Sequence, residues 1–209
     1  MSKNSKDLMD VNNYVKDLRE VIQNSYNTPW GITNNAKEII IALIKNLDGS
    51  FVINDDVAIH KEAIIEENVV MKGPIIINKE CIVKSGSYLR DGVYLGERVI
   101  IGPNCEVKSS FIFGKTRIAH LNYVGNSIIG FDVNVEAGAI TANHFNEKCD
   151  SEKMIKVRIN GELVNTNSIK FGSLIGDGSR IGANAVLNPG TILLPKSVVN
   201  RLEYVDQLH

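Results

Sequence analysis

The chain has 209 residues, of which 44% are hydrophobic and 22% are charged, as is usual for a soluble globular protein that buries its own core. Its 23 basic and 24 acidic residues give a net charge of −1 and form no long basic block, which argues against nucleic acid or an anionic membrane as a partner. No run of about 18 apolar residues and no signal-peptide layout occur, so we expect a cytoplasmic protein with no membrane span.

The cysteines carry little functional signal. Cys81, Cys105 and Cys149 are odd in number and form no CxxC motif, so we expect neither a disulfide framework nor a structural zinc site. We expect Cys81 and Cys105 to be small residues of the core. No metal is therefore expected in the protein.

Residues 1–50 have the apolar spacing of α-helices and differ from the rest of the chain. Apolar residues three and four positions apart predict one helix over residues 8–22 and a second over residues 39–47. Between them, Thr28-Pro29-Trp30-Gly31 has the residues of a turn and is predicted to connect the two helices. We expect Trp30 to be a packing residue rather than a platform for a ligand.

A six-residue repeat follows. Stepping by six from Ile59 reaches an apolar residue at each of ten steps, and a second small or apolar residue stands four positions after most of them. The frame returns at Ile129 and Val135, and again from Ile169 to Leu193. An α-helix needs spacings of three and four, so this period excludes one. The first run comprises Ile59, Ile65, Met71, Ile77, Val83, Leu89, Leu95, Ile101, Val107, Phe113 and Ala119.

This period predicts a mainly β fold in which a short strand and a turn repeat. Three repeats close one triangular coil of about 18 residues, and the apolar positions stack inside it at a strand spacing of about 4.8 Å. Parallel crossovers are usually right-handed, so the period alone does not set the hand of the coil. We predict a parallel β-helix domain over residues 51–199, preceded by a helical segment over 1–50 and followed by a tail over 200–209.

Residues 144–168 interrupt the repeat. Within them, the sequence KVRINGELV has alternating apolar residues on either side of Asn160-Gly161, which is a strong signal for a two-residue hairpin turn. We therefore predict an inserted β-hairpin loop that projects from one corner of the coil.

The repeat also breaks near His120, and functional sites often lie where a sequence departs from its own local pattern. Ten residues separate Ala119 from Ile129, where two repeats need twelve, and the segment HLNYVGNSI lies between them. Arg90 and Lys108 are 18 residues apart, so we expect them to lie one above the other as an anion site. Lys108 and His120 lie two repeats apart and hence on different faces, which could meet around a corner or across a subunit boundary.

The run from Arg90 to Asn143, with its IGPNCEVKSS and AHLNYVGNSIIG segments, resembles the acetyltransferase domain of the bacterial bifunctional UDP-N-acetylglucosamine pyrophosphorylase/glucosamine-1-phosphate acetyltransferases. Farther along, NSIKFGSLIGDGSRIGANAVLNPGT is similar to archaeal sugar-phosphate nucleotidyltransferases and to short stand-alone proteins of the same superfamily. The resemblance implies a left-handed coil, a homotrimer with cofactor grooves between its subunits, and acetyl-CoA as co-substrate. It also implies N-acetylation of an amino-sugar phosphate, most directly glucosamine 1-phosphate to N-acetylglucosamine 1-phosphate in UDP-N-acetylglucosamine biosynthesis.

The same resemblance implies roles for single residues. His120 matches the general base that takes a proton from the sugar ammonium, a task that suits an imidazole. Arg90 and Lys108 match the pair that binds the phosphate. Glu106 is a candidate for orienting His120. The remaining matches are Tyr123, Asn134 and Asn143 for binding the sugar, Ala137 for a backbone N–H that faces the thioester oxygen, and Ala183 for the pantetheine groove.

Each assignment has a structural alternative. His120 is then a solvated side chain, and Arg90 and Lys108 are two surface charges that happen to stack. Asn134 has the alternative role of a left-handed turn residue at a corner of the coil.

Three other functions stay open at this point. One is an acetyltransferase of this fold with another acceptor, such as a nucleotide-linked amino sugar, and another is a non-catalytic trimerising or regulatory module. A zinc hydratase of this fold needs three histidines, and only His120 and His144 lie near the site. No Gly-rich nucleotidyltransferase motif occurs and the chain ends soon after Ser197, so we expect no uridylyl transfer and a shallow groove for CoA.

Overall fold

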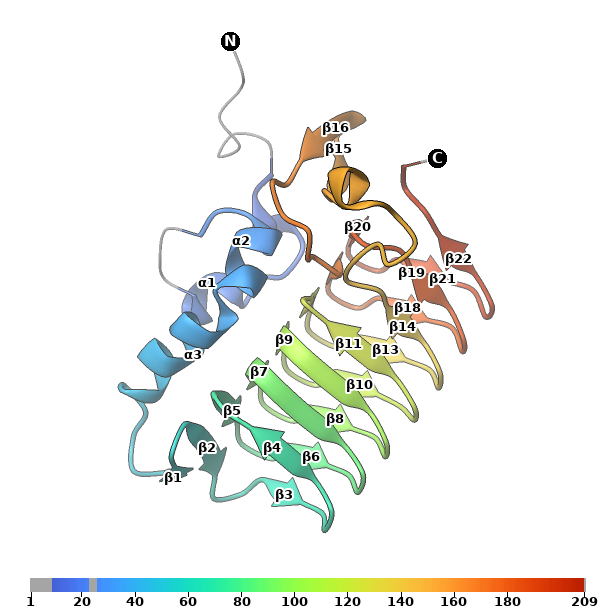
Figure 1. Cartoon of the computed structure of the whole chain (residues 1–209). Coiled ribbons are helices and arrows are strands. Elements are labelled where there is room, and N and C mark those ends of the chain that lie inside the picture. The colour runs from blue at the N-terminus through green and yellow to red at the C-terminus, as the bar shows by residue number, and fades with distance from the viewer. Residues whose placement is uncertain (1–8, 23–25, 209) are drawn as a thin grey trace.

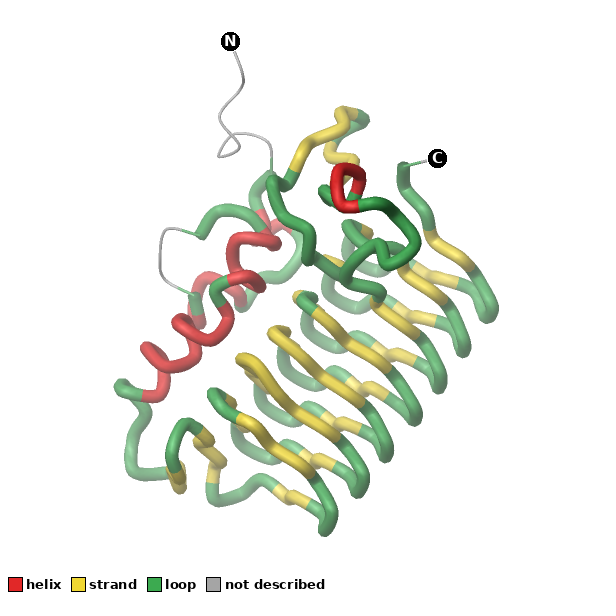
Figure 2. Tube along the Cα trace, viewed as in Figure 1, coloured by secondary structure: helices red, strands yellow, loops and turns green. Residues whose placement is uncertain are grey.

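Short parallel strands wind into a left-handed β-helix, and the helices of the described chain lie along one side of it (Figure 1). The computed structural model describes residues 9–22 and 26–208, so Leu8 and His209 lie outside it. Figure 2 shows strands alternating with turns along the coils, while the N-terminal helices gather on one side and one short helical turn lies apart from them. The mainly β fold predicted from the six-residue repeat is confirmed. Among the described residues, no helix has the length and apolar character needed to cross a membrane.

One face of the coil is a seven-stranded parallel sheet, which we call the short-strand face. A 13-stranded sheet bends around the other two faces. The strands of the short-strand face are β3 (Ile64–Ile65), β6 (Ile82–Val83), β8 (Ile100–Ile101), β10 (Arg117–Ile118), β13 (Asn134–Val135), β18 (Arg180–Ile181) and β21 (Val198–Val199).

The 13-stranded sheet divides into a tyrosine face and a helix-covered face, because its two longest strands turn the corner between them. These strands are β7 (Tyr88–Leu95) and β9 (Glu106–Ile112). The tyrosine face also contains β4 (Val70–Lys72), β11 (Tyr123–Gly125), β14 (Ile140–Thr141), β19 (Val186–Leu187) and β22 (Tyr204–Val205). The helix-covered face contains β2 (Val57–His60), β5 (Ile75–Ile77), β12 (Ile128–Ile129), β17 (Ser173–Ile175) and β20 (Thr191–Leu193), with β1 (Phe51–Asn54) antiparallel to β2.

Aliphatic side chains from all three faces fill the interior of the coil. Leu89, Leu95 and Ile101 of the predicted repeat are fully buried there, and each such side chain contributes about 1.5–3 kcal/mol to folding. Cys81 and Cys105 lie in the same core, as expected.

The predicted repeat frame is wrong by one residue beyond Val107. Ile112 lies in the interior, whereas Phe113, the predicted interior residue, packs between the coil and the helices. The next interior residue is accordingly Ile118 and not Ala119. Two successive coils are therefore each one residue shorter than the 18 that the repeat predicts, because Val107 is in register with Val124 and Val124 with Thr141.

Each of these coils is shortened at the corner between the tyrosine face and the helix-covered face. β7 crosses this corner with Asp91 and Gly92, whereas β9 crosses it with Ser109 alone. Asn126 takes the same position in the next coil. The repeat thus breaks twice at this corner, at Ser109 and at Asn126, and the second break lies within the predicted segment HLNYVGNSI but not at His120 itself.

A second core lies between the helices and the helix-covered face. Its helices are a short 3-10 helix η2 (Val11–Asn13), α1 (Leu18–Val21), α2 (Pro29–Asn34) and α3 (Ala36–Ile44). The Trp30 ring packs edge-on against the Phe171 ring, with 5.9 Å between centroids, so Trp30 is a packing residue as expected.

Two predictions for this segment are wrong. The expected connector starts helix α2, because Thr28 Oγ1 accepts a hydrogen bond from the Gly31 N–H (3.2 Å) and Pro29 fills the first helical position. The helix expected over residues 8–22 is reduced to η2 and α1 in its described part. There the Asp177 N–H, in a turn of the coil, donates to the Tyr14 carbonyl (2.8 Å). A longer helix would need this carbonyl as an acceptor for its own backbone N–H groups.

The inserted segment forms the predicted hairpin. After a 3-10 turn η3 (Asp150–Glu152), β15 (Lys156–Ile159) pairs antiparallel with β16 (Glu162–Asn165). Asn160 and Gly161 have φ angles of 50° and 81°, as a two-residue turn of this kind needs. Ile169, which the repeat frame places inside the coil, is exposed, and the interior resumes at Ile175.

Candidate functional site

His120 lies at the corner where the short-strand face meets the tyrosine face, which we call the His120 corner. The backbone turns there through a left-handed residue in successive coils, and Leu121, Gly138 and Asn184 are three of them. The His120 carbonyl accepts a hydrogen bond from the Gly138 N–H, 2.9 Å away. The His120 side chain is exposed and bonds to no other described residue.

Two residues expected near the cofactor stack above His120. The Ala137 carbonyl accepts from the Asn184 N–H, and the Ala183 carbonyl accepts from the Leu202 N–H, each over 2.9 Å. His120, Ala137 and Ala183 therefore lie on successive coils of one corner. The Ala183 N–H donates to Glu136 Oε2 (2.9 Å).

Arg90 and Lys108 lie in register on β7 and β9, one above the other, as their spacing predicts. Arg90 donates to the Glu106 carboxylate from Nε (2.9 Å) and to Asp91 Oδ2 from Nη1 (2.7 Å). Lys108 Nζ lies 3.8 Å from Asp91 Oδ2. Both cations thus face carboxylates of the chain itself.

The charges around Asp91 shift the proton affinities of this cluster. A hydrogen bond from Lys37 Nζ, 2.7 Å from Asp91 Oδ1, is the main reason why the pKa of Asp91 is lowered. Partial burial, with Lys170 and Arg90 nearby, lowers the pKa of Lys108. A bound anion would stabilise the protonated form of Lys108, because it would offset the repulsion from the neighbouring cations. The cluster therefore has the electrostatics of an anion site.

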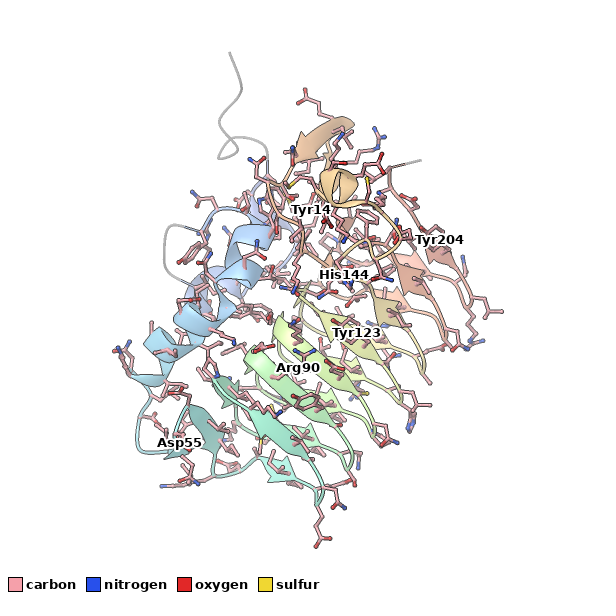
Figure 3. All side chains as sticks on the ribbon, viewed as in Figure 1. Tyr14, Asp55, Arg90, Tyr123, His144 and Tyr204 are labelled. Carbon is pink, nitrogen blue, oxygen red and sulfur yellow. The ribbon has the colours of Figure 1, made fainter. Side chains whose placement is uncertain are left out.

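Tyr123 and Asn143 lie beside these cations. Tyr123 is in register with Glu106, and burial raises the pKa of its hydroxyl. Asn143 Nδ2 donates to Asn126 Oδ1 (2.7 Å), and His144 Nδ1 lies 3.1 Å from Asn143 Oδ1. Figure 3 shows Arg90, Tyr123 and His144 following one another toward the inserted segment.

Gly125 makes room for this group. A Cβ atom at Gly125 would lie 2.5 Å from Tyr123 Oη and 2.8 Å from Asn143 Nδ2. Gly125 is also in register with Lys108. Gly125 and Asn126 were not among the predicted site residues, although a glycine inside a strand is a signal for close approach of other groups.

Glu106 and Asn134 do not lie where the predicted site needs them within the described chain. Glu106, a candidate for orienting His120, accepts hydrogen bonds from Arg90 instead and makes none to His120, because it lies within the tyrosine face and His120 at its edge. Asn134 lies on the short-strand face, in register with Arg117 and Arg180. Asn134 is in a strand and not among the left-handed corner residues, so its structural alternative is wrong.

The site therefore has two parts that β11 connects. This strand begins three residues after His120 and ends at Gly125, in register with Lys108. An exposed imidazole lies before one end of the strand and two cations lie beside its other end, with Tyr123 between them. Within residues 9–22 and 26–208, no group of three His, Cys, Asp or Glu side chains is arranged to hold a metal ion.

Comparisons with known proteins agree with this architecture. Residues 71–207 match a family model described as the GMPPB C-terminal domain. A bifunctional GlmU protein of Methanococcus maripaludis is 40% identical over 205 residues, which cover 95% of this chain and 46% of the relative. A bifunctional sugar-1-phosphate nucleotidylyltransferase/acetyltransferase of Sulfurisphaera tokodaii is 39% identical over 103 residues, which cover 46% of this chain and 24% of the relative. This chain thus spans less than half the length of either relative.

One solved structure is similar at lower identity. It is PerB from Caulobacter crescentus in complex with CoA and GDP-perosamine. The match covers 68% of this chain and 50% of that chain, with 13% sequence identity and a TM-score of 0.34.

Proposed function

This chain belongs to the GMPPB C-terminal domain family, and on that premise we propose that it is an acetyl-CoA-dependent N-acetyltransferase whose acceptor is glucosamine 1-phosphate. The observation that carries the proposal is the arrangement around β11. An exposed imidazole precedes this strand, and two stacked cations lie in register with its end. The relatives named GlmU and the bifunctional acetyltransferase of Sulfurisphaera tokodaii support the same chemistry.

In this proposal the acceptor lies along β11. Its phosphate binds Arg90 and Lys108, and its amine lies toward His120. Tyr123 and Asn143, between these ends, donate or accept hydrogen bonds with the sugar hydroxyls. Binding the phosphate at a fixed distance from the base orients the amine for attack.

The chemistry needs one base and one oxyanion donor. His120 removes a proton from the ammonium, the free amine attacks the thioester carbonyl, and a tetrahedral intermediate forms. The Ala137 N–H makes no hydrogen bond to the described residues, and in this proposal it stabilises the oxyanion. The carbon–sulfur bond then breaks and CoA leaves as the thiol with one of the two protons that the nitrogen loses. The other proton passes to solvent, and the amide remains on the sugar.

Asn134 requires a second subunit in this scheme. It lies on the short-strand face, so it reaches an acceptor on a tyrosine face only if two copies pack side by side. We propose a homotrimer in the cytoplasm whose CoA grooves lie between subunits, beside Ala137 and Ala183. Light scattering of the purified protein tests the trimer, and a monomer would contradict it.

The catalytic proposal is tested by thiol release from acetyl-CoA in the presence of glucosamine 1-phosphate. We expect His120→Ala to lower kcat by about 10²- to 10⁴-fold, the usual contribution of a general base. His60→Ala is the matched control, since His60 lies on β2 against Phe51. Equal thiol release by wild type and His120→Ala would contradict the role of His120, and no release by the wild type would contradict the activity.

The phosphate pair is tested with the same assay. We expect Arg90→Ala and Lys108→Ala to raise KM for the sugar phosphate while changing kcat less, because the pair binds a group that does not react. A change confined to KM for acetyl-CoA would show that these residues do not bind the acceptor.

A further inference from the structure

A cavity of about 800 Å³, which we call the helix pocket, lies between α1, α3 and the helix-covered face of the coil. None of the residues that line it belongs to the candidate site described above. Sites for small molecules in proteins usually have volumes of about 300–1,000 Å³ and mostly apolar walls that carry a few polar groups. The helix pocket therefore has the dimensions of a small-molecule site.

The walls of the helix pocket are largely apolar. Val21 lines it from α1, and Ile39 and Leu43 line it from α3. Ile76 of β5 forms part of the floor. Ala42 of α3 leaves space at one wall, because its side chain is a single methyl group and is exposed. Such walls favour a ligand with an apolar body, since burying that body removes apolar surface from water.

The polar groups at the floor of the helix pocket already have partners in the chain. Asn78 Nδ2 donates to the Leu95 carbonyl (2.7 Å), and the Asn78 side chain also bonds to the Tyr94 hydroxyl. Burial raises the pKa of Tyr94 to about 12, so this hydroxyl is uncharged at neutral pH. A charged part of a ligand therefore gains nothing from the floor.

The charged groups of the lining are two carboxylates from different helices. Glu20 lies on α1 and Glu38 lies on α3, and neither forms an ion pair with another described residue. No lysine, arginine or histidine of the described chain lines the helix pocket. An adjoining pocket of about 200 Å³ also borders Glu20, but its lining includes Arg98 and Lys115. Of these two pockets, the larger one thus has acidic groups without a counter-ion.

We propose that the helix pocket binds a small amphiphilic cation, with an organic ammonium group beside Glu20 and Glu38 and an apolar body against the walls. Charge complementarity favours this head group, because an ammonium supplies the counter-ion that both carboxylates lack. The apolar lining favours the rest of the ligand, since each methylene group buried there strengthens binding. An anion with the same body is repelled by both carboxylates. This site is separate from the proposed acetyl transfer and does not depend on it.

Hexylammonium is the probe for this site, and hexan-1-ol and hexanoate keep its chain while changing its head group. NMR titration of protein labelled at its isoleucine methyl groups follows Ile39 and Ile76 in the pocket, with Ile140 on the tyrosine face as the control. We expect hexylammonium to shift the signals of Ile39 and Ile76 but not that of Ile140. It should bind roughly fivefold more tightly than hexan-1-ol, and hexanoate should bind most weakly.

Three variants test the rim and the wall separately. Glu20→Gln and Glu38→Gln should each raise the Kd for hexylammonium roughly two- to fivefold and leave the Kd for hexan-1-ol unchanged. Glu67→Gln is the matched control, since Glu67 is exposed and lies outside the pocket. Ala42→Trp should abolish binding of both compounds, because the indole fills the space beside α3 from an exposed position that does not disturb folding.

Each comparison has a result that overturns the proposal. If hexan-1-ol or hexanoate binds as tightly as hexylammonium, the carboxylates do not recognise the ligand. If both glutamine variants at the rim keep the Kd of Glu67→Gln, or if Ala42→Trp binds like the wild type, the ligand does not occupy the helix pocket. Absence of thiol release by the wild type would overturn the proposed activity and not the pocket, because the two assays use different ligands.

Discussion

The two corners that bound the tyrosine face are built in different ways. At the His120 corner, successive coils are joined by backbone hydrogen bonds such as that from Gly138 N–H to the His120 carbonyl. His120 and Leu121 extend into solvent there, and Leu121 is 65% exposed. The other corner is formed by Asp91, Ser109 and Asn126, and we call it the insertion corner. There, side chains join the coils: Ser127 N–H donates to Ser110 Oγ (3.0 Å), and the Asn126 amide accepts from Asn143.

This difference separates two requirements of a site. A regular corner leaves a side chain such as His120 free of internal partners, so that it is available to a substrate or a second subunit. An irregular corner, shortened at Ser109 and opened by the inserted segment, buries polar groups in fixed positions. The position of a reactive group and the shape of a binding pocket are thus determined by different features of the same coil.

The largest expected effect concerns the interior that both corners share. Ile101→Ala removes a fully buried side chain from the column and should lower the free energy of unfolding by about 2–5 kcal/mol. Its neighbour Ile100 points outward on the same strand, so Ile100→Ala should lower it by less than about 1 kcal/mol. Urea unfolding of the two variants measures the difference. Equal losses would mean that the interior column does not dominate stability.

The second prediction compares the corners directly. Asn143→Ala leaves the Asn126 amide oxygen without its buried partner, so we expect a loss of about 1–3 kcal/mol in the free energy of unfolding. Leu121→Ala at the His120 corner should change it by no more than about 0.5 kcal/mol. The same urea titrations measure both values. A larger loss for Leu121→Ala would contradict the contrast between a polar and a backbone-built corner.

The fold was predictable as far as the apolar period extends. Leu89, Leu95 and Ile101 occupy the interior because a six-residue period places them there. The frame failed at Ser109, since the length of a corner is not encoded in the spacing of apolar residues. Thr28 was predicted to lie in a turn and not at the start of a helix, because the sequence Thr28-Pro29-Trp30-Gly31 fits both.

The site was predictable only in part for the same reason. The stacking of Arg90 and Lys108 follows from their separation by one coil. Lys37 and Lys170 could not be placed beside them, because Lys37 belongs to a helix and Lys170 follows the inserted segment, and the packing of these parts follows no repeat. The position of Asn134 follows from the repeat, but the role proposed for it needs a second subunit.

The third prediction uses Gly125, which makes room for the two side chains that we propose bind the sugar. Gly125→Ala should displace the Tyr123 hydroxyl or the Asn143 amide, both of which are ends of side chains, so the coil should still fold. We expect KM for the sugar phosphate to rise about tenfold with a smaller change in kcat. Gly49→Ala is the control, since a Cβ there meets no atom within 4 Å. Unchanged KM in Gly125→Ala would place the acceptor elsewhere.

The smallest effect concerns Glu136, a carboxylate that joins two coils at the His120 corner through its side chain. Hydrogen bonds from Arg201, and then from the Ala183 N–H, lower the pKa of Glu136 from its ordinary value of 4.5 to about 2. Because the pKa is lower in the folded protein, this contribution to stability is complete above pH 4.5 and is lost as the pH falls toward about 2.

Glu136→Gln should therefore flatten the decrease in Tm of the wild type between pH 4.5 and about pH 2, and the two proteins should converge at the acid end. Thermal unfolding at several values across this range measures the slopes, with Glu147→Gln, an exposed change on the inserted segment, as the control. A Glu136→Gln protein with the wild-type slope would mean that backbone hydrogen bonds alone hold this corner. The contrast between the two corners would then be sharper than the contacts of Glu136 indicate.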